Sequence, residues 1–191
     1  MKKTLIVAGL GLALMISGSY AIISYKGDKT EAATTTNHEA TQQVPKVSQA
    51  ELDKASKDIG EIKKDNDLYY TIVTLALQKL EFKGEKNYLI PGTPDVKRLQ
   101  FNLANLQYLK NRAVAIKATE LYQKTLDKWL KGDFSNMEND YLTIRSIKTD
   151  TSQPSESPVL KVRTTEEEQK YIEHFFGEEG LQINKRDWQY L

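Results

Sequence analysis

Apolar residues recur at spacings of three and four along most of the chain after residue 48, which is the pattern of amphipathic α-helices. Ser48-Gln49-Ala50-Glu51 has the residue types and spacing of a capping box, so we expect a helix to begin there. The apolar stripe is interrupted at Gly60 and again at the polar residues 65–67. Because both features weaken a helix, the pattern predicts either one long bent helix or two helices over residues 49–81.

The same periodicity predicts further helices in the middle of the chain. Thr93-Pro94 supplies an N-cap residue and a proline at the first helical position, where the missing N–H costs nothing. We expect the helix that begins there to present an apolar seam of Val96, Leu99, Leu103 and Leu106. Another helix is expected at about residues 113–131. Residues 110–112 contain neither glycine nor proline, so it stays open whether a turn separates the two helices.

Turn residues mark the next boundaries. Gly132 is typical of the position just after a helix, and Asp133 is placed to cap a short helix through Met137 and Ile144. Residues 149–158 are polar and contain two prolines, which predicts a loop. Residues 159–162 then suit a short extended segment.

A second capping box, Thr165-Glu166-Glu167-Glu168, opens the last expected helix, and Gly177 is expected to end it. The tail after Glu178 ends in aromatic residues that can dock on the helices. Together these elements predict an all-α fold in which residues 48–191 form a compact bundle of about five helices.

The chain begins with a different pattern. Thr4 to Ser24 form an almost continuous apolar run behind Lys2 and Lys3. At a rise of about 1.5 Å per residue, the run would cover about 30 Å, which is the thickness of a bilayer's hydrocarbon core. Residues 1–25 therefore predict a transmembrane signal anchor. The alternative is a signal peptide cleaved after Ser19-Tyr20-Ala21, but the apolar residues that continue to Tyr25 favour the anchor.

The flanking residues predict the orientation and the linker. The basic start stays in the cytoplasm by the positive-inside rule, so the C-terminal domain is expected to be extracytoplasmic on a single-pass membrane protein, or secreted if the segment is cleaved. Residues 26–47 are rich in Thr, Ala and Gln and lack an apolar face. Their composition predicts a disordered tether.

Charge and cysteine content exclude several classes of protein. Without Lys2 and Lys3, 25 of the 27 basic side chains remain against 26 acidic ones, whereas a nucleic-acid-binding domain normally has a basic surplus. We therefore expect no nucleic-acid partner. The chain has no cysteine, so neither disulfides nor a thiolate nucleophile contribute.

Candidate chemistry is sparse. The two histidines, His38 in the tether and His174 in the last helix, cannot form a multi-histidine metal site, and no EF-hand, phosphate-binding loop or nucleotide fingerprint occurs. We expect no metal or cofactor. Carboxylates gather near Asp133 and again at Glu166, Glu167 and Glu168, and carboxylates near Asp133 combined with His174 are the acid–base arrangement that we favour among these. A gathering of aromatic residues in the C-terminal half is expected either to fill the core or to line a groove.

Trp129-Leu130-Lys131-Gly132-Asp133-Phe134-Ser135, together with Thr165-Glu166-Glu167-Glu168 and Tyr171-Ile172, resembles a family of short, N-terminally anchored proteins from Gram-positive, Bacillus-type bacteria, which is catalogued as a domain of unknown function. The resemblance covers about residues 71–176. It departs from the family pattern at Leu77, where a histidine is expected. The resemblance implies a helical architecture and an envelope location, and no activity.

These observations predict a membrane-tethered, extracytoplasmic helical domain that acts by non-covalent binding of an envelope protein or peptide, in envelope maintenance or secretion. It would contact the membrane through residues 4–24. Two alternatives stay open. One is an envelope hydrolase that uses carboxylates near Asp133 with His174, and the other is a small peptide-binding or immunity protein.

Overall fold

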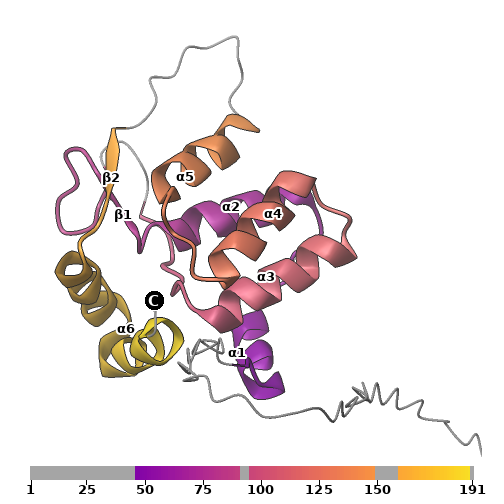
Figure 1. The fold of residues 1–191 in the computed structure, drawn as a ribbon, viewed down its shortest axis with the longest axis horizontal. Helices are drawn as coiled ribbons and strands as arrows, with labels where there is room; N and C mark the ends of the chain where they lie inside the picture. Colours follow the sequence, from indigo (N-terminus) through magenta and orange to yellow (C-terminus); the bar gives the residue numbers. More distant parts are fainter. Residues whose placement is uncertain (1–45, 91–94, 149–158, 190–191) are drawn as a thin grey trace, which may run out of the picture. The chain divides into compact units, whose positions relative to one another are not determined.

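The computed structural model describes residues 46–90, 95–148 and 159–189. These residues are mostly helical, as predicted, and contain six α-helices and a two-stranded sheet (Figure 1). In chain order the elements are α1 (Gln49–Ile59), α2 (Asp65–Ala76), β1 (Leu80–Phe82), α3 (Leu103–Ala115), α4 (Glu120–Leu130), α5 (Met137–Ser146), β2 (Leu160–Val162) and α6 (Thr165–Trp188).

The predicted anchor and nearly all of the predicted tether lie outside the described residues. Within the described ranges, no helix has the length and apolar character needed to cross a membrane.

The first two helices confirm one of the two arrangements predicted for residues 49–81. The capping box at the start of α1 is present, because the Ser48 amide donates to the Glu51 carboxylate at 2.8 Å and the Glu51 amide donates to the Ser48 hydroxyl at 3.3 Å. Gly60 ends α1 with a φ of 89°, a conformation that side-chain-bearing residues rarely adopt. In α2, Asp67 accepts hydrogen bonds from the amides of residues 63 and 64, so the polar patch serves as the helix start.

The end of the second helix was predicted wrongly, because residues 80–82 are a strand. β1 pairs antiparallel with β2, with Glu81 opposite Lys161, and the expected extended segment at 159–162 is confirmed by β2. After α2, the Lys79 carbonyl accepts from the Arg163 amide at 2.9 Å. The backbone groups of residues 79–82 therefore bond to residues 160–163. The helical spacing of apolar residues carries no information on this distant partner strand.

Residues 95–102 are not helical, which corrects the helix expected to begin at Thr93-Pro94, itself outside the described residues. α3 begins only at Leu103, where the Asn102 side chain accepts from the Asn105 amide at 2.8 Å as an N-cap. The extended backbone before it bonds to side chains from distant elements, as the Phe101 amide does to the Gln78 side chain. Tertiary contacts therefore outweigh the local capping signal.

The break between α3 and α4 also differs from prediction. Residues 110–112 lie inside α3, and the chain turns at residues 116–119, so the helix expected over residues 113–131 is divided. Lys117 takes a φ of 53° and the Ala118 amide donates to the Ala113 carbonyl at 2.8 Å, which closes the end of α3. Neither glycine nor proline marks this turn in the sequence.

The last helix is longer than predicted and bent. Its capping box uses Thr164 and Glu167, one residue earlier than expected. Gly177, with a φ of 62°, ends the first segment as predicted, but the chain then continues as helix to Trp188, and Figure 1 shows the two segments meeting at an angle. In the second segment, Gly180 lacks a Cβ that would overlap Phe176, and its carbonyl accepts from the Gln100 side chain at 2.6 Å.

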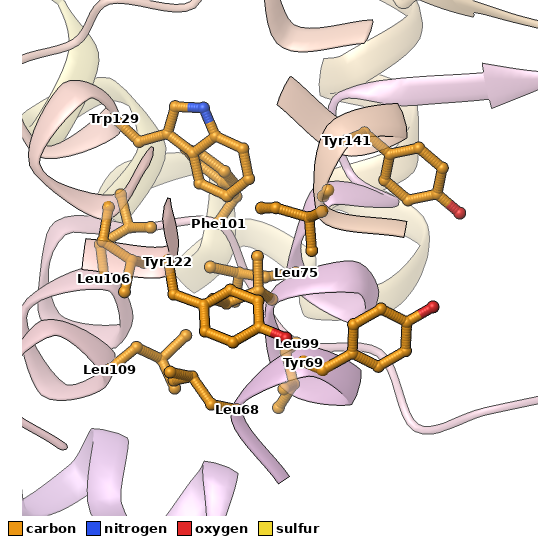
Figure 2. Packing of buried hydrophobic residues seen from close by; sticks show 14 of the residues in the cluster. Leu68, Tyr69, Leu75, Leu99, Phe101, Leu106, Leu109, Tyr122, Trp129 and Tyr141 are labelled. Atoms are coloured by element: carbon orange, nitrogen blue, oxygen red, sulfur yellow. The ribbon is translucent and has the colours of Figure 1, made fainter. Parts of the chain in front are cut away.

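Most of the hydrophobic core comes from α2, α3, α4 and α5, in which α3 and α5 each pack against α2 and α4, and β1 and Tyr171 of α6 add to it. Figure 2 shows Tyr122 and Trp129 of α4 among leucines of α2 and α3. Both side chains are fully buried, as is that of Phe101 in the non-helical residues 95–102, which we call the extended segment. Aromatic side chains of this size each remove about 150–250 Å² from water, so this cluster contributes a large part of the burial energy.

A buried amide, Gln78, joins three parts of the fold. It lies just after α2 with no exposed surface. Its Oε1 accepts from the Phe101 amide at 2.8 Å, and its Nε2 donates to Glu168 at 2.7 Å and to Asn184 at 3.5 Å, both on α6. One side chain thereby positions the extended segment and both halves of α6 against the end of α2.

We predict that replacing Gln78 with Leu lowers the free energy of unfolding by about 1–3 kcal/mol, because the Phe101 amide and the Glu168 carboxylate lose a buried partner. The measurement is urea denaturation followed by circular dichroism. The control is the exposed Gln182 in the same helix α6, whose replacement by Leu should change stability by less than about 0.5 kcal/mol. Equal effects of the two substitutions would show that Gln78 has no special role.

Candidate functional site

Asp133, the centre of the predicted carboxylate group, lies in an exposed turn. Its Oδ1 accepts hydrogen bonds from the amide and the hydroxyl of Ser135 at 3.2 and 2.6 Å. These bonds hold the pKa of Asp133 below its ordinary value. The expected cap on the next helix is wrong, because Asn136 occupies the N-cap of α5. Asp133 instead closes a local turn, as aspartates commonly do.

The carboxylates around Asp133 each hold a different structural contact. Asp127 pairs with Lys110 at 2.6 Å, and Glu138 accepts from the backbone amide of Val162 at 3.0 Å. On α5, Asp140 accepts from the Trp129 indole at 3.0 Å and from Lys128 at 2.8 Å (partners on α4). These acidic groups therefore stabilise the packing of neighbouring elements.

His174 lies exposed on α6, where its ring packs on Tyr88 and Phe175 with centroid separations of 5.1 and 4.6 Å. Among the residues that the structure describes, no hydrogen bond, ion pair or cavity lining joins it to Asp133. His38 is outside them. In the same part of the chain, no three side chains of the His, Asp and Glu types are placed to hold a metal ion.

A groove of about 980 Å³ runs along α6, and we call it the α6 groove. Its aromatic wall is formed by Phe134 and Trp188, whose rings meet edge to face at 5.1 Å. The Trp188 indole also donates to the Phe101 carbonyl at 3.2 Å, which fixes the wall on the extended segment. The aromatic residues of the C-terminal half thus divide between the two predicted roles, since Trp129 is in the core and this pair lines a groove.

The base of the α6 groove is formed by Lys79 and Glu168, whose opposite charges neutralise each other. The Lys79 ammonium pairs with Glu168 at 2.8 Å, and both side chains are largely buried, with 9% and 13% of their surface exposed. The same ammonium lies 4.6 Å from the centroid of the Phe134 ring and 5.8 Å from that of Trp188. Cation–π contacts and the ion pair together keep Lys79 in place, so the aromatic wall has a rigid support.

The rim of the α6 groove is polar and has both signs of charge. Beside the exposed Val162, its exposed polar side chains are Thr165, Glu166, Gln169, Lys170, Glu173, Lys185 and Gln189. A rigid aromatic wall surrounded by polar, solvated groups is the composition typical of protein-binding surfaces. Amide and charged side chains at the rim can donate to and accept from a peptide backbone, whereas the arrangement offers no paired nucleophile and base.

Sequence reasoning missed the residues that form the base of this groove. Gln78 and Lys79 were assigned to the end of a predicted helix, and Glu168 to a capping box. One signal was available, because a glutamine and a lysine interrupt the otherwise apolar run from Leu75 to Leu80. Polar side chains within such a run have to find partners when they are buried. Their partners come from about 90 residues later in the chain, as the separations of 90 and 89 residues from Glu168 show, and local patterns do not reveal them.

No family model, no curated protein and no solved structure matches this chain. The resemblance to a Bacillus-type family over residues 71–176 therefore stays a prediction, and it assigns no residue to the α6 groove.

We predict that Asp140→Ala lowers the free energy of unfolding by about 1–3 kcal/mol, because the buried Trp129 indole loses its acceptor. Asp133→Ala should have a smaller effect, since its carboxylate bonds only within an exposed turn. Denaturant unfolding measured by tryptophan fluorescence compares the two variants. A larger destabilisation by Asp133→Ala than by Asp140→Ala would contradict the structural roles assigned here.

Proposed function

We propose that this chain is a membrane-tethered, extracytoplasmic helical domain that binds a peptide or a segment of another envelope protein in its α6 groove. The observation that carries the proposal is the groove itself, with the Phe134–Trp188 wall above a base in which Lys79 and Glu168 neutralise each other. A small peptide-binding or immunity protein would use the same surface, so that alternative differs in biological setting and not in binding mode.

The dimensions and composition of the groove support a peptide as the occupant. At about 980 Å³ it is at the upper end of the range of small-molecule sites, and it is open along the helix. An extended segment can place one apolar side chain against Trp188 while its backbone bonds to amide side chains such as Gln169 and Asn184. Ion pairs at the rim then contribute to specificity more than to affinity.

The hydrolase alternative receives no support from the geometry. Asp133 and its acidic neighbours are engaged in turns, ion pairs and helix packing, and His174 packs against aromatic rings. A hydrolase needs a nucleophile or a water molecule placed between groups that exchange a proton.

The location is part of the proposal. The apolar run from Thr4 to Ser24 with the basic residues before it supports insertion with the C-terminal domain outside the cytoplasm. A domain held at the membrane by residues 26–47 would sample partners close to the bilayer, which suits a role in envelope maintenance or secretion.

We predict that a phosphatase reporter that is active only after export is active when fused after Lys26, and that a reporter active only in the cytoplasm is not. The physical reason is that Lys2 and Lys3 hold the N-terminus on the cytoplasmic side. Enzyme assays on whole cells give the readout. The opposite pattern would reverse the proposed topology.

We predict that a photocrosslinking amino acid at Gln169, on the rim of the α6 groove, yields an adduct of defined mass in living cells. The matched control is Lys124, which is exposed on α4 and does not line the groove. Gln189 at the other end of the rim should give an adduct with the same partner. Equal crosslinking from Lys124, or none from either groove position, would show that the groove is not the binding surface.

A further inference from the structure

A second hollow, of about 330 Å³, lies where α1, residues 97–102, the start of α3 and α6 meet, and we call it the Arg98 cavity. Part of its lining is apolar and comes from Ala55, Leu99, Phe175, Phe176 and Ile183. The remainder is polar and comprises four cations, two carboxylates and three amide side chains. A volume of this size is at the lower end of the range of small-molecule sites.

Arg98 is the most deeply buried charge in this cavity, with 6% of its side chain exposed. Its two terminal nitrogens donate to backbone carbonyls, of Tyr88 at 2.7 Å and of Val96 at 3.3 Å, and its guanidinium lies 5.2 Å from the ring centroid of Phe175. Its third nitrogen, Nε, is buried and has no hydrogen-bond partner among the described residues. Carbonyl groups orient this guanidinium but do not neutralise it.

The carboxylate nearest to Arg98 is a weak partner. Asp95 lies 3.6 Å from the guanidinium, and 73% of its side chain is exposed, so water screens the pair. Arg163, whose Nε is likewise buried without a hydrogen-bond partner among the described residues, shows the contrast in ion pairing. Arg163 pairs directly with Glu85, and only 5% of each side chain is exposed. A buried charge is costly unless its counter-ion is also buried and hydrogen-bonded to it, and Asp95, which is mostly exposed, does not fill this role for Arg98.

The side chains that line the cavity leave a basic surplus, because Asp95 and Asp187, which pair with Arg98 and Arg186, are not part of its lining. Lys54 pairs with Asp58 at 2.7 Å, and Arg186 pairs with Glu51, so these four side chains cancel. Lys97 donates to the backbone carbonyl of Asp58 at 2.6 Å and forms no ion pair among the described residues, whereas Arg98 has only the exposed Asp95 at 3.6 Å. Two adjacent cations therefore face a cavity whose other wall is apolar.

We propose that the Arg98 cavity binds a small amphiphilic anion, with a carboxylate or phosphate group at Lys97 and Arg98 and an apolar group against Phe175 and Phe176. An anionic oxygen accepts charge-assisted hydrogen bonds from a guanidinium, and it supplies the buried counter-charge that Asp95 does not. The apolar group removes the two phenylalanine rings from water. This site is separate from the α6 groove and does not depend on the function proposed for that groove.

The test is isothermal titration calorimetry on the full chain in phosphatidylcholine nanodiscs, with phenyl phosphate as the probe. Inorganic phosphate and benzyl alcohol carry only the anionic or only the apolar part, and each is expected to bind at least about tenfold more weakly, because each loses one of the two sets of contacts. Absence of phenyl phosphate binding at millimolar concentration would overturn the proposal. Equal binding of inorganic phosphate would overturn the apolar part and with it the amphiphile.

Two variants and a control locate the binding. Lys97→Gln should weaken phenyl phosphate binding about three- to fivefold, and Arg98→Lys, which removes the guanidinium donors, about tenfold. Lys57→Gln removes the same charge from an exposed position of α1 that does not line the cavity, and it should change nothing. Circular dichroism checks folding, and if Arg98→Lys is unfolded, Lys97→Gln alone decides. An equal loss in Lys97→Gln and Lys57→Gln would overturn the site.

Repeating the titration in nanodiscs that contain phosphatidylglycerol distinguishes two sources of the anion. If phenyl phosphate binds more weakly in these nanodiscs, and this difference between the two lipid compositions disappears in Lys97→Gln, a lipid headgroup is supported as the natural occupant. Unchanged binding supports a soluble anion.

Discussion

The packing of α6 on the rest of the domain depends on one buried amide, the side chain of Gln78. Its oxygen and nitrogen are both used, one by the extended segment and the other by α6. The extended segment needs such partners because residues 95–102 belong to no helix or sheet, yet the backbone of Phe101 is buried. Asp187 serves the same purpose, since its carboxylate accepts from the Leu103 amide at 2.8 Å, and burial raises its pKa. A buried polar network that is satisfied in one arrangement specifies that arrangement strongly.

The sequence predicted those parts of the fold that local chemistry controls. The Ser48–Glu51 capping box and the glycine after α4 depend on residues within a few positions, and both are present. The extended segment before α6 was also predicted, although its pairing with β1 was not. The strand at residues 80–82 and the extended segment at 95–102 depend on partners far along the chain. For both stretches the periodicity of apolar residues wrongly predicted a helix. The turn after Ala115 had no glycine or proline to announce it.

The candidate sites follow the same division. Phe134 and Trp188 belong to an aromatic set for which the sequence allowed a groove, but which members are exposed was decided by packing. The carboxylates near Asp133 are close in sequence, and the structure assigns them to separate contacts. Arg98 gave no signal, because an arginine in a predicted amphipathic helix is ordinarily on the solvent face, whereas the extended backbone carries it into a cavity. Both hollows share α6 as a wall, so the bend at Gly177 shapes the two surfaces together.

The ion pair between Glu51 and Arg186 has a mechanical consequence. Glu51 belongs to the capping box that begins the folded domain, so it lies where the preceding chain would apply tension if that chain is anchored. Arg186 is hydrogen-bonded in turn to Asp187, which holds the start of α3. A pull on the chain before Ser48 is thus carried by this series of polar contacts into the last turns of α6. If the chain before Ser48 is anchored, as we propose, the load would reach α6 at Arg186, which lines the Arg98 cavity.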